Sequence, residues 1–463
     1  PASAVDKIMR HSFLSLAVSL AAYSVIWAAL VAAPILYSGE STAQEAQTSG
    51  DEWDAWDEFD EFEENEEVSS FTWAGFGEIA LGQRLSSDPA INTDKTLRDL
   101  RVQLQADYTL EASTLTFRGD LYYDGVLDSV EVQIREAAWQ GNLAFLGDWG
   151  SKFDAKIGQQ VLTWGTGDYV FLNDMFPKDY QSFFAGRDDE YLKAPSLSAK
   201  LSGYFDWVNV DLVVTPQFEP DNGITGEYFS FFNPQFGMNV APAFDVLERN
   251  EPDDAEWALR MYKTVGQTEF AFYGYRGYNK TPMAADEQGL PRYSRLNVWG
   301  ASAVKPLGPG LAKFEYAYHD AMEDDDGTNP LVPNSQHRFL VGYEQELVAN
   351  LTGSVQWYTE HIVDHDALLA NSYWPQYEQE ESRHVVTTQL MYRALRQTLT
   401  LNWFNFYSPT DSDGYMKFRA TYSPVDEWQI NGGANLFYGD EPHTFYSQFN
   451  DASNVYASFR YFY

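Results

Sequence analysis

Arginine and lysine side chains recur at the polar positions of alternating segments, and they are the residues best suited to do chemistry in this sequence. In the segment 101–104, for example, Arg101 and Gln103 alternate with Val102 and Leu104. A guanidinium group can bind a carboxylate through two parallel hydrogen bonds, so a row of such groups can guide anionic solutes. The predicted pore-lining set, which includes one glutamine, is Arg101, Arg118, Arg135, Lys156, Gln160, Arg393, Lys417, Arg419 and Arg460.

Acidic side chains are interleaved with this basic set. Asp107, Asp120, Glu131 and Asp154 fall on the same polar faces of the predicted segments. They could pair with the basic groups and brace a wall, in which case the arginines would select nothing. An anion track and a ladder of structural ion pairs are therefore both open interpretations of the sequence.

Catalytic chemistry finds little support. Cysteine is absent, which excludes disulfides and thiolate nucleophiles. No Gly-x-Ser-x-Gly motif occurs, and His361 and His365 are four apart but lie at the end of a predicted strand rather than on one helical face. The acidic segment 323–329 could bind Ca²⁺ or form a solvated turn. We expect no enzyme activity, no cofactor and no metal site, and the net charge of -38 argues against nucleic acid as a partner.

Two predicted loops are rich in aromatic side chains. They span 165–194 and 219–254, and so many apolar rings should pack against protein rather than face water. We expect both loops to fold over or into the mouth of a pore, and the first of them to narrow it. The predicted constriction residues are Trp164, Tyr169, Phe171, Phe176, Phe183, Phe184, Phe231 and Phe232.

The elements that must position these residues are β-strands. After residue 69 nearly every segment alternates apolar and polar residues with a period of two, which predicts strands with one apolar and one polar face. About eighteen such strands, sixteen at the fewest, are joined alternately by short and by generally longer connections. That alternation predicts an all-β, antiparallel, up-and-down transmembrane β-barrel over 70–463.

The N-terminal part has a different composition. Residues 1–43 contain a long apolar run followed by small residues, which predicts a signal peptide; residues 1–8 would then precede the true start, and a retained helical anchor is the alternative. Residues 44–69 form an acidic arm expected in the periplasm. Within it an aromatic residue recurs every third position, at Trp53, Trp56, Phe59 and Phe62. The arm is either a plain spacer or a segment that binds a periplasmic partner.

Two passages resemble a group of proteobacterial porin-like outer-membrane proteins, similar in style to alginate-export porins. The first is Arg-Glu-Ala-Ala-Trp at 135–139 together with Lys-Ile-Gly-Gln-Gln-Val-Leu-Thr-Trp-Gly at 156–165; Gln159 stands where the family more often has arginine. The second is the final hairpin, 437–463, which ends on an aromatic strand. The resemblance implies a passive transporter whose last strand is recognised by the barrel assembly machinery.

These observations together predict a monomeric or trimeric porin in the bacterial outer membrane, with both chain ends in the periplasm. Small solutes, anionic or else aromatic and hydrophobic, would diffuse through it, and outer-membrane lipid would surround it. The alternatives are a structural barrel that docks a periplasmic partner through the acidic arm, and an outer-membrane hydrolase.

Overall fold

The computed structural model describes residues 70–241 and 252–463. The predicted signal peptide and acidic arm, including Trp53, Trp56, Phe59 and Phe62, lie outside the described residues. No helix among the described residues is long and apolar enough to cross a membrane.

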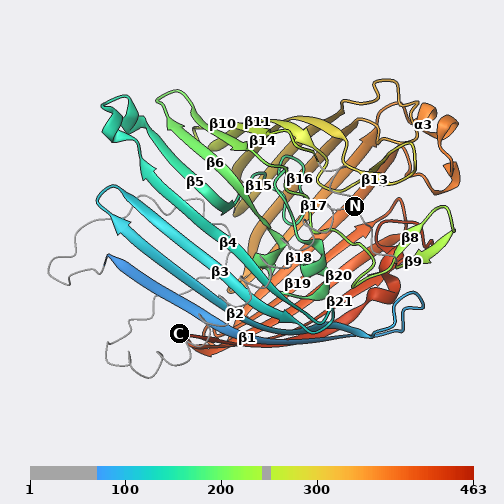
Figure 1. The fold of residues 1–463 in the computed structure, drawn as a ribbon, viewed down its shortest axis with the longest axis horizontal. Coiled ribbons are helices and arrows are strands. Elements are labelled where there is room, and N and C mark those ends of the chain that lie inside the picture. The colour runs from blue at the N-terminus through green and yellow to red at the C-terminus, as the bar shows by residue number, and fades with distance from the viewer. Residues whose placement is uncertain (1–69, 242–251) are drawn as a thin grey trace, which may run out of the picture. The chain divides into compact units, whose positions relative to one another are not determined.

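The described residues form a closed antiparallel β-barrel of eighteen strands (Figure 1). Each strand pairs with its neighbours in the chain, and the first pairs with the last, Phe76 opposite Phe462, which closes the ring. The predicted fold class is confirmed. The strands are β1 (Phe71–Arg84), β2 (Lys95–Leu110), β3 (Ser113–Asp124), β4 (Ser129–Asn142), β5 (Phe153–Val161), β6 (Pro195–Tyr204), β7 (Asn209–Thr215), β10 (Glu256–Val265), β11 (Thr268–Tyr278), β14 (Arg295–Leu307), β15 (Gly310–Ala321), β16 (Gln336–Val348), β17 (Leu351–Ile362), β18 (Ser382–Ala394), β19 (Leu399–Ser408), β20 (Asp413–Val425), β21 (Trp428–Tyr438) and β22 (Asn454–Phe462).

Short elements decorate the connections. Two small hairpins, β8 (Phe231–Asn233) with β9 (Met238–Val240) and β12 (Ala284–Ala285) with β13 (Pro291–Arg292), stand apart from the barrel sheet. The helices among the described residues are short: α2 (Tyr180–Ala185), α3 (His365–Asn371), and the 3-10 turns η1 (Ala144–Leu146), η2 (Gly150–Lys152), η3 (Asp189–Leu192), η5 (Pro375–Tyr377) and η6 (Ser447–Ala452).

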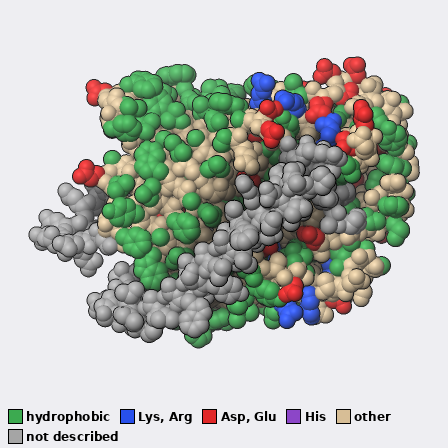
Figure 2. Space-filling model, viewed as in Figure 1, with side chains coloured by type: hydrophobic (Ala, Val, Ile, Leu, Met, Phe, Trp, Pro, Cys, Tyr) green, Lys and Arg blue, Asp and Glu red, His purple; other side chains and the backbone are tan. Residues whose placement is uncertain are grey.

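The strand period of two separates an apolar outer wall from a polar inner wall. On β2, Val102 and Leu104 are exposed on the outside, whereas Arg101 and Gln103 are buried on the inside. Figure 2 shows the result as hydrophobic side chains spread over much of the visible barrel wall, with charged groups gathered toward one end. Because the sheet is closed, the backbone groups of its strands are hydrogen-bonded to neighbouring strands. The apolar side chains on its outer face can then lie against hydrocarbon.

The two ends of the barrel differ in their connections. At one end the strands are joined by short turns, such as 111–112 and 349–350, where Asn350 adopts the left-handed conformation that a two-residue turn requires. At the other end the connections are mostly longer, for example 216–255 and 363–381. The beginning of β1 and the end of β22 both lie at the short-turn end, because the strands alternate in direction around the ring.

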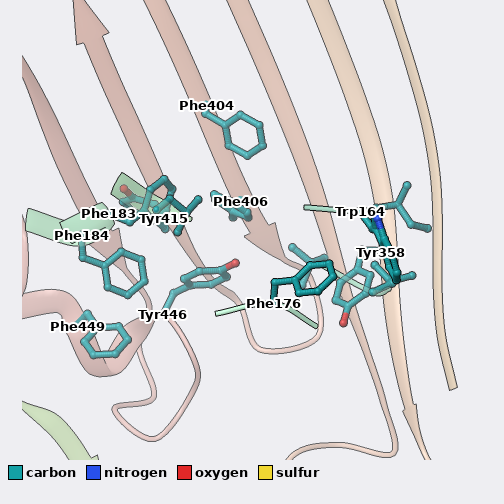
Figure 3. Packing of buried hydrophobic residues seen from close by; sticks show 14 of the residues in the cluster. Trp164, Phe176, Phe183, Phe184, Tyr358, Phe404, Phe406, Tyr415, Tyr446 and Phe449 are labelled. Atoms are coloured by element: carbon teal, nitrogen blue, oxygen red, sulfur yellow. The ribbon is translucent and has the colours of Figure 1, made fainter. Parts of the chain in front are cut away.

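The core of the barrel unit lies inside the ring rather than between two sheets. It is formed by inward side chains of the strands and by the connection 162–194 between β5 and β6, which we call the inner loop. Among its buried members are Leu172 of the inner loop and Leu340 of β16. Figure 3 shows two others, Phe184 of the inner loop and Phe404 of β19.

Candidate functional site

The inner loop crosses the interior of the barrel. It leaves the ring at β5 and returns at β6, yet the Tyr169 ring packs edge-on against Phe404 of β19, with 4.8 Å between ring centroids. In a ring of eighteen strands, β18 and β19 lie opposite the pair β5 and β6. The loop therefore reaches the far wall and divides the interior.

Local sequence explains how the loop can turn within so small a space. Gly165 has φ +90°, and a Cβ there would lie 3.1 Å from Oε1 of Glu315. The Asp179 side chain caps α2 by accepting a hydrogen bond from Ser182 N at 2.7 Å, and Gly186, with φ +94°, ends the helix in the left-handed conformation. The loop therefore bends at a glycine and carries one capped helical turn to its tip.

A buried carboxylate on β15 holds the first part of the loop. The Glu315 side chain accepts hydrogen bonds from Thr166 N at 2.7 Å, Thr166 Oγ1 at 2.9 Å, Asn173 N at 3.1 Å and Asn173 Nδ2 at 2.9 Å. On β17, the Gln356 amide oxygen accepts from Asp168 N at 2.8 Å. These bonds satisfy backbone groups that would otherwise be buried without partners.

Aromatic packing holds the middle of the loop. Phe183 and Phe184 of α2 pack against Tyr415 of β20 (Figure 3). Phe184 also packs against Phe437 of β21, with 5.1 Å between the ring centroids. Trp164, at the start of the loop, packs edge-on against Phe176 at 5.1 Å. Large rings that are buried in this way contribute about 1.5–3 kcal/mol each relative to exposure.

Arg187 fixes the tip of the loop. Its Nε donates to Asp99 Oδ2 on β2 at 2.7 Å, and its Nη2 donates to Asp124 Oδ2 on β3 at 2.9 Å. Tyr228, from the connection between β7 and β10, donates to the same carboxylate of Asp124. Two loops and two strands thus meet at one guanidinium.

Arginines and tyrosines alternate in a stack beside this tip. The Arg135 guanidinium lies 4.6 Å from the centroid of the Tyr191 ring, and Arg101 lies 4.2 Å from both Tyr191 and Tyr122. Cation–π contacts of this kind add to the attachment of η3 to β2, β3 and β4.

Three consecutive acids of the inner loop face three cations of the wall. Asp188 accepts from Arg419 of β20 at 2.5 Å, Asp189 pairs with Lys417 of β20, and Glu190 accepts from Arg460 of β22 at 3.2 Å. These carboxylates keep partial exposure, between 22% and 32% of the side chain. The loop and the wall are therefore joined by ion pairs in which the loop supplies the carboxylates and the wall supplies the cations.

Burial and charge compete in setting the pKa values of these acids. For Asp188 burial opposes ionisation, but Arg419 and Arg460 outweigh it and hold the pKa below the usual range. For Asp189 burial also favours the neutral form, but the positive charges of Lys417 and Arg419 outweigh burial, so the pKa of Asp189 is lowered as well. Burial, joined by the neighbouring charge of Asp188, raises the pKa of Glu190. Asp188 and Asp189 are thus charged partners of the wall at neutral pH.

The predicted pore-lining residues separate into two groups. Arg101, Arg135, Lys417, Arg419 and Arg460 converge on the tip of the inner loop; Arg101 pairs with Asp120 at 2.5 Å, and Arg135 donates to the backbone oxygens of Glu190 and Lys193.

The other members lie away from that tip. Arg118 is half-buried and donates to Gln105 at 3.0 Å, and Lys156 pairs with Glu136 at 2.5 Å. Gln160 is buried and donates to Ser198 O at 3.1 Å. Arg393 is exposed, near the short-turn end of β18.

The predicted constriction residues also divide by location. Trp164, Tyr169, Phe171, Phe176, Phe183 and Phe184 all belong to the inner loop and its core cluster, and Phe231 packs against that cluster from β8. Phe232 lies among the connections at the long-loop end, where its ring centroid is 5.0 Å from that of Tyr377 and 6.1 Å from that of His443.

Sequence reasoning missed the anchors Glu315, Asp99 and Arg187. The run Arg-Asp-Asp-Glu at 187–190 was a detectable signal, because four charged residues within an aromatic loop need partners if the loop is buried. The acidic turn at 323–329 is tied to its neighbours, with Glu323 paired to Arg292 at 2.7 Å. Within 70–241 and 252–463, no three His, Asp or Glu side chains are grouped as a metal site would need.

Comparisons with known proteins bear on the fold. No protein-family model matches the chain, and no curated protein matches its sequence. Among solved structures, OccAB3 of Acinetobacter baumannii has a TM-score of 0.52 and 10% identity, covering 86% of this chain and 100% of that chain. OccAB1 of the same bacterium has a TM-score of 0.48 and 9% identity over 86% and 97% of the two chains. A mutant of Rh. blastica porin has a TM-score of 0.36 and 11% identity over 85% and 100%. The likeness to OccAB3 shows a shared fold.

Proposed function

We propose that this protein is a bacterial outer-membrane channel for passive diffusion of small solutes, with a bore set by the inner loop. One observation carries the proposal: a single loop spans the interior of a closed barrel and is attached to strands on several sides of the ring. Glu315 holds it at β15, Arg187 at β2 and β3, and Asp188 at β20. A loop so placed narrows any path through the barrel.

The two faces of the wall support a membrane channel. The outer face carries exposed apolar side chains on strand after strand, as on β1 with Ile79 and Leu81. The inner face carries charges, such as Asp211 and Arg260, that only water or ion pairs could satisfy. An apolar exterior with a polar interior is the arrangement of a barrel that passes polar solutes through a lipid bilayer.

The interior favours polar solutes over hydrophobic ones. The aromatic side chains of the inner loop are turned into the core cluster, where Phe183 is 5% and Phe184 is 6% exposed, so they offer little surface to a passing solute. The partly exposed groups beside them are charged: Asp188, Asp189 and Glu190. The proposal therefore places small polar solutes ahead of aromatic ones.

Charge selectivity should depend on the near balance between positive and negative side chains inside the barrel. Most wall cations are paired with acids of the inner loop or of the wall; Arg118 and Lys156 are half-buried and contact Gln105 and Glu136 rather than the acids of η3. A solute carboxylate would meet these two groups on the short-turn side of the inner loop. We propose a weak preference for anions, together with membership of the porin-like group that the motifs at 135–139 and 156–165 resemble.

Liposome swelling tests the function directly. Purified barrel reconstituted into liposomes should admit small sugars, amino acids and small carboxylates at rates that fall steeply with solute size. An empty-liposome control and a barrel unfolded by heat set the background. A folded barrel that admits none of these solutes would exclude the channel and leave the structural barrel and the outer-membrane hydrolase as the alternatives.

A further inference from the structure

Histidines gather on the outer wall of the barrel, where the inner site does not reach. His337, His361 and His384 lie on β16, β17 and β18. On β16 and β17 the histidines lie on the outward face of the strand. They are an even number of residues away from Val341 and Trp357, whose side chains are 49% and 44% exposed. The intervening residues point inward, and among them Leu340, Tyr358 and Val385 are buried. Three imidazoles on three adjacent strands are thus turned toward the surroundings of the barrel.

Strand register arranges this surface in rows. The row nearest the long-loop end contains Tyr318, His337, His361 and Ser382, each opposite the next on adjacent strands.

Two further rows follow toward the middle of the barrel. The second row is Tyr316, Phe339, Thr359 and His384, and the third is Phe314, Val341, Trp357 and Val386. Polarity falls from row to row: hydroxyls and imidazoles come first, a mixed row follows, and the third row is wholly apolar. We call the first two rows the histidine patch.

The patch contains a shallow hollow and two imidazoles that are held by hydrogen bonds at Nδ1. This shallow hollow of about 470 Å³, largely open to the surroundings, is lined by Tyr316, His337, Phe339 and His361. Nδ1 of His337 is hydrogen-bonded to Tyr316 OH at 2.9 Å, and Nδ1 of His361 to Ser382 Oγ at 2.9 Å. Each of these imidazoles therefore has its Nδ1 engaged, and its Nε2 makes no hydrogen bond within the part of the chain that the structure describes.

We propose that the histidine patch binds a phosphate-bearing lipid of the outer leaflet. This inference rests on the proposed outer-membrane location. The donors of His337 and His361 would meet the phosphate at the level where strands give way to long loops, and the acyl chain would run down the apolar third row past Phe314 and Val341. The wall becomes less polar from the first row to the third, and a lipid becomes less polar from its headgroup to its acyl chain. This match identifies a lipid as the occupant.

The carboxylate of Asp320, on the same outer wall, should weaken phosphate binding at the histidine patch. Asp320, two residues beyond Tyr318 on β15, falls on the outward face closer to the long-loop end. Its carboxylate opposes a phosphate placed against the first row. Removing that charge should therefore strengthen lipid binding, whereas removing the imidazole donors should weaken it.

Native mass spectrometry and thermal shift in detergent test the proposal with a bisphosphorylated lipid A and its dephosphorylated form as probes. The intact barrel should retain the phosphorylated lipid and gain thermal stability from it, and should bind the dephosphorylated lipid on the order of tenfold more weakly. The pair His337→Phe and His361→Phe, which keeps the rings and removes the donors, should lose this difference. The pair His337→Gln and His361→Gln should restore much of it, and Asp320→Asn should increase it.

A matched control is His365→Gln, which removes a histidine from α3, away from the wall. It should leave lipid binding unchanged. Equal binding of the two lipids by the intact barrel, or undiminished preference in the double Phe variant, would overturn the proposal. A loss of self-association in that variant with no change in lipid binding would assign the patch to a second copy of this chain instead. Liposome swelling of the same variants should stay normal, which separates this proposal from the channel function.

Discussion

Arg187 in the inner loop and Asp99 on β2 form a buried ion pair, with 2.7 Å between Nε and Oδ2 and side chains 6% and 2% exposed. The same guanidinium also pairs with Asp124 of β3. Two buried carboxylates therefore share one cation, and that cation belongs to a loop that leaves the ring three strands away. The position of the loop tip depends on this contact.

Arg187→Ala should loosen the loop tip. It would leave Asp99 and Asp124 buried without their cation, and breaking a buried pair in this way costs about 3–5 kcal/mol. The expected result is frequent current fluctuation in single-channel recordings and faster proteolysis within 180–194. Arg187→Lys, which keeps the charge but can engage fewer acceptors, should show a smaller effect. A quiet channel with a protected loop in the alanine variant would mean that aromatic packing alone holds the tip.

The strands and their connections could be predicted because the two faces of a membrane barrel impose a period of two on the sequence. Leu104 outside and Gln103 inside illustrate the rule; the alternating segments supplied the strand count, and the alternation of short and long connections indicated a barrel. Local patterns were sufficient because each strand pairs only with its neighbours in the ring.

The anchors of the inner loop could not be predicted in the same way. Glu315 is one polar residue among many on inward faces, and nothing in its local sequence indicates that it accepts four hydrogen bonds from residues about 150 positions away. Asp99 and Arg187 likewise meet only through the closure of the ring. The interior of a barrel is set by long-range contacts, and a single sequence carries no local signal for them.

Glu315→Ala should release the first part of the inner loop. The donors of Thr166 and Asn173 would be left buried without acceptors, at a cost of about 1–3 kcal/mol for each unsatisfied group. We expect a lower unfolding temperature and increased current noise, with Glu315→Gln intermediate because it keeps part of the acceptor capacity. Glu346→Gln, on the exposed end of β16, is the matched control and should behave as the native protein. If Glu315→Ala matched that control in both measurements, the carboxylate would not anchor the loop.

Acidic pH should tighten the contact between the inner loop and the connection after β7. Burial raises the pKa of Asp221 to about 6, although the charge and backbone N–H of Lys178 act in the opposite sense. Because the folded pKa lies above the unfolded value near 3.9, the stabilising contribution is present at low pH and is lost as pH rises through 6. A two-unit shift corresponds to about 3 kcal/mol, which partial exposure of the side chain reduces to roughly 1–2.

Hydrogen exchange of the 176–182 amides at pH 5 and pH 7.5, corrected for intrinsic rates, measures this effect. Protection should be greater at pH 5, and Asp221→Asn should remove the difference. The pH window stays above the range in which Asp188 and Asp189 lose charge, since their pKa values are lowered. Equal protection at both pH values in the native protein would show that Asp221 does not control the contact.

Ion selectivity should shift in one direction when cations of the barrel wall are removed and in the other when an acid of the inner loop is removed. Arg118→Ala combined with Arg419→Ala removes two wall cations and leaves Asp188 with less compensation, so reversal potentials in a salt gradient should shift toward cations. Asp188→Asn should shift them toward anions. A clear cation preference in the intact barrel, or no shift in the double variant, would mean that these arginines brace the wall and select nothing.

Single-channel conductance in planar bilayers tests the central claim, that the inner loop sets the bore. Residues 169–191 would be replaced by a short Gly-Ser linker, and a matched variant would shorten the connection 363–381 at the long-loop end instead. Folding of both variants would be verified by heat-modifiable migration before recording. The account predicts a conductance well above that of the native barrel for the first variant and little change for the second. A folded barrel that lacks 169–191 and still conducts as the native protein does would contradict it.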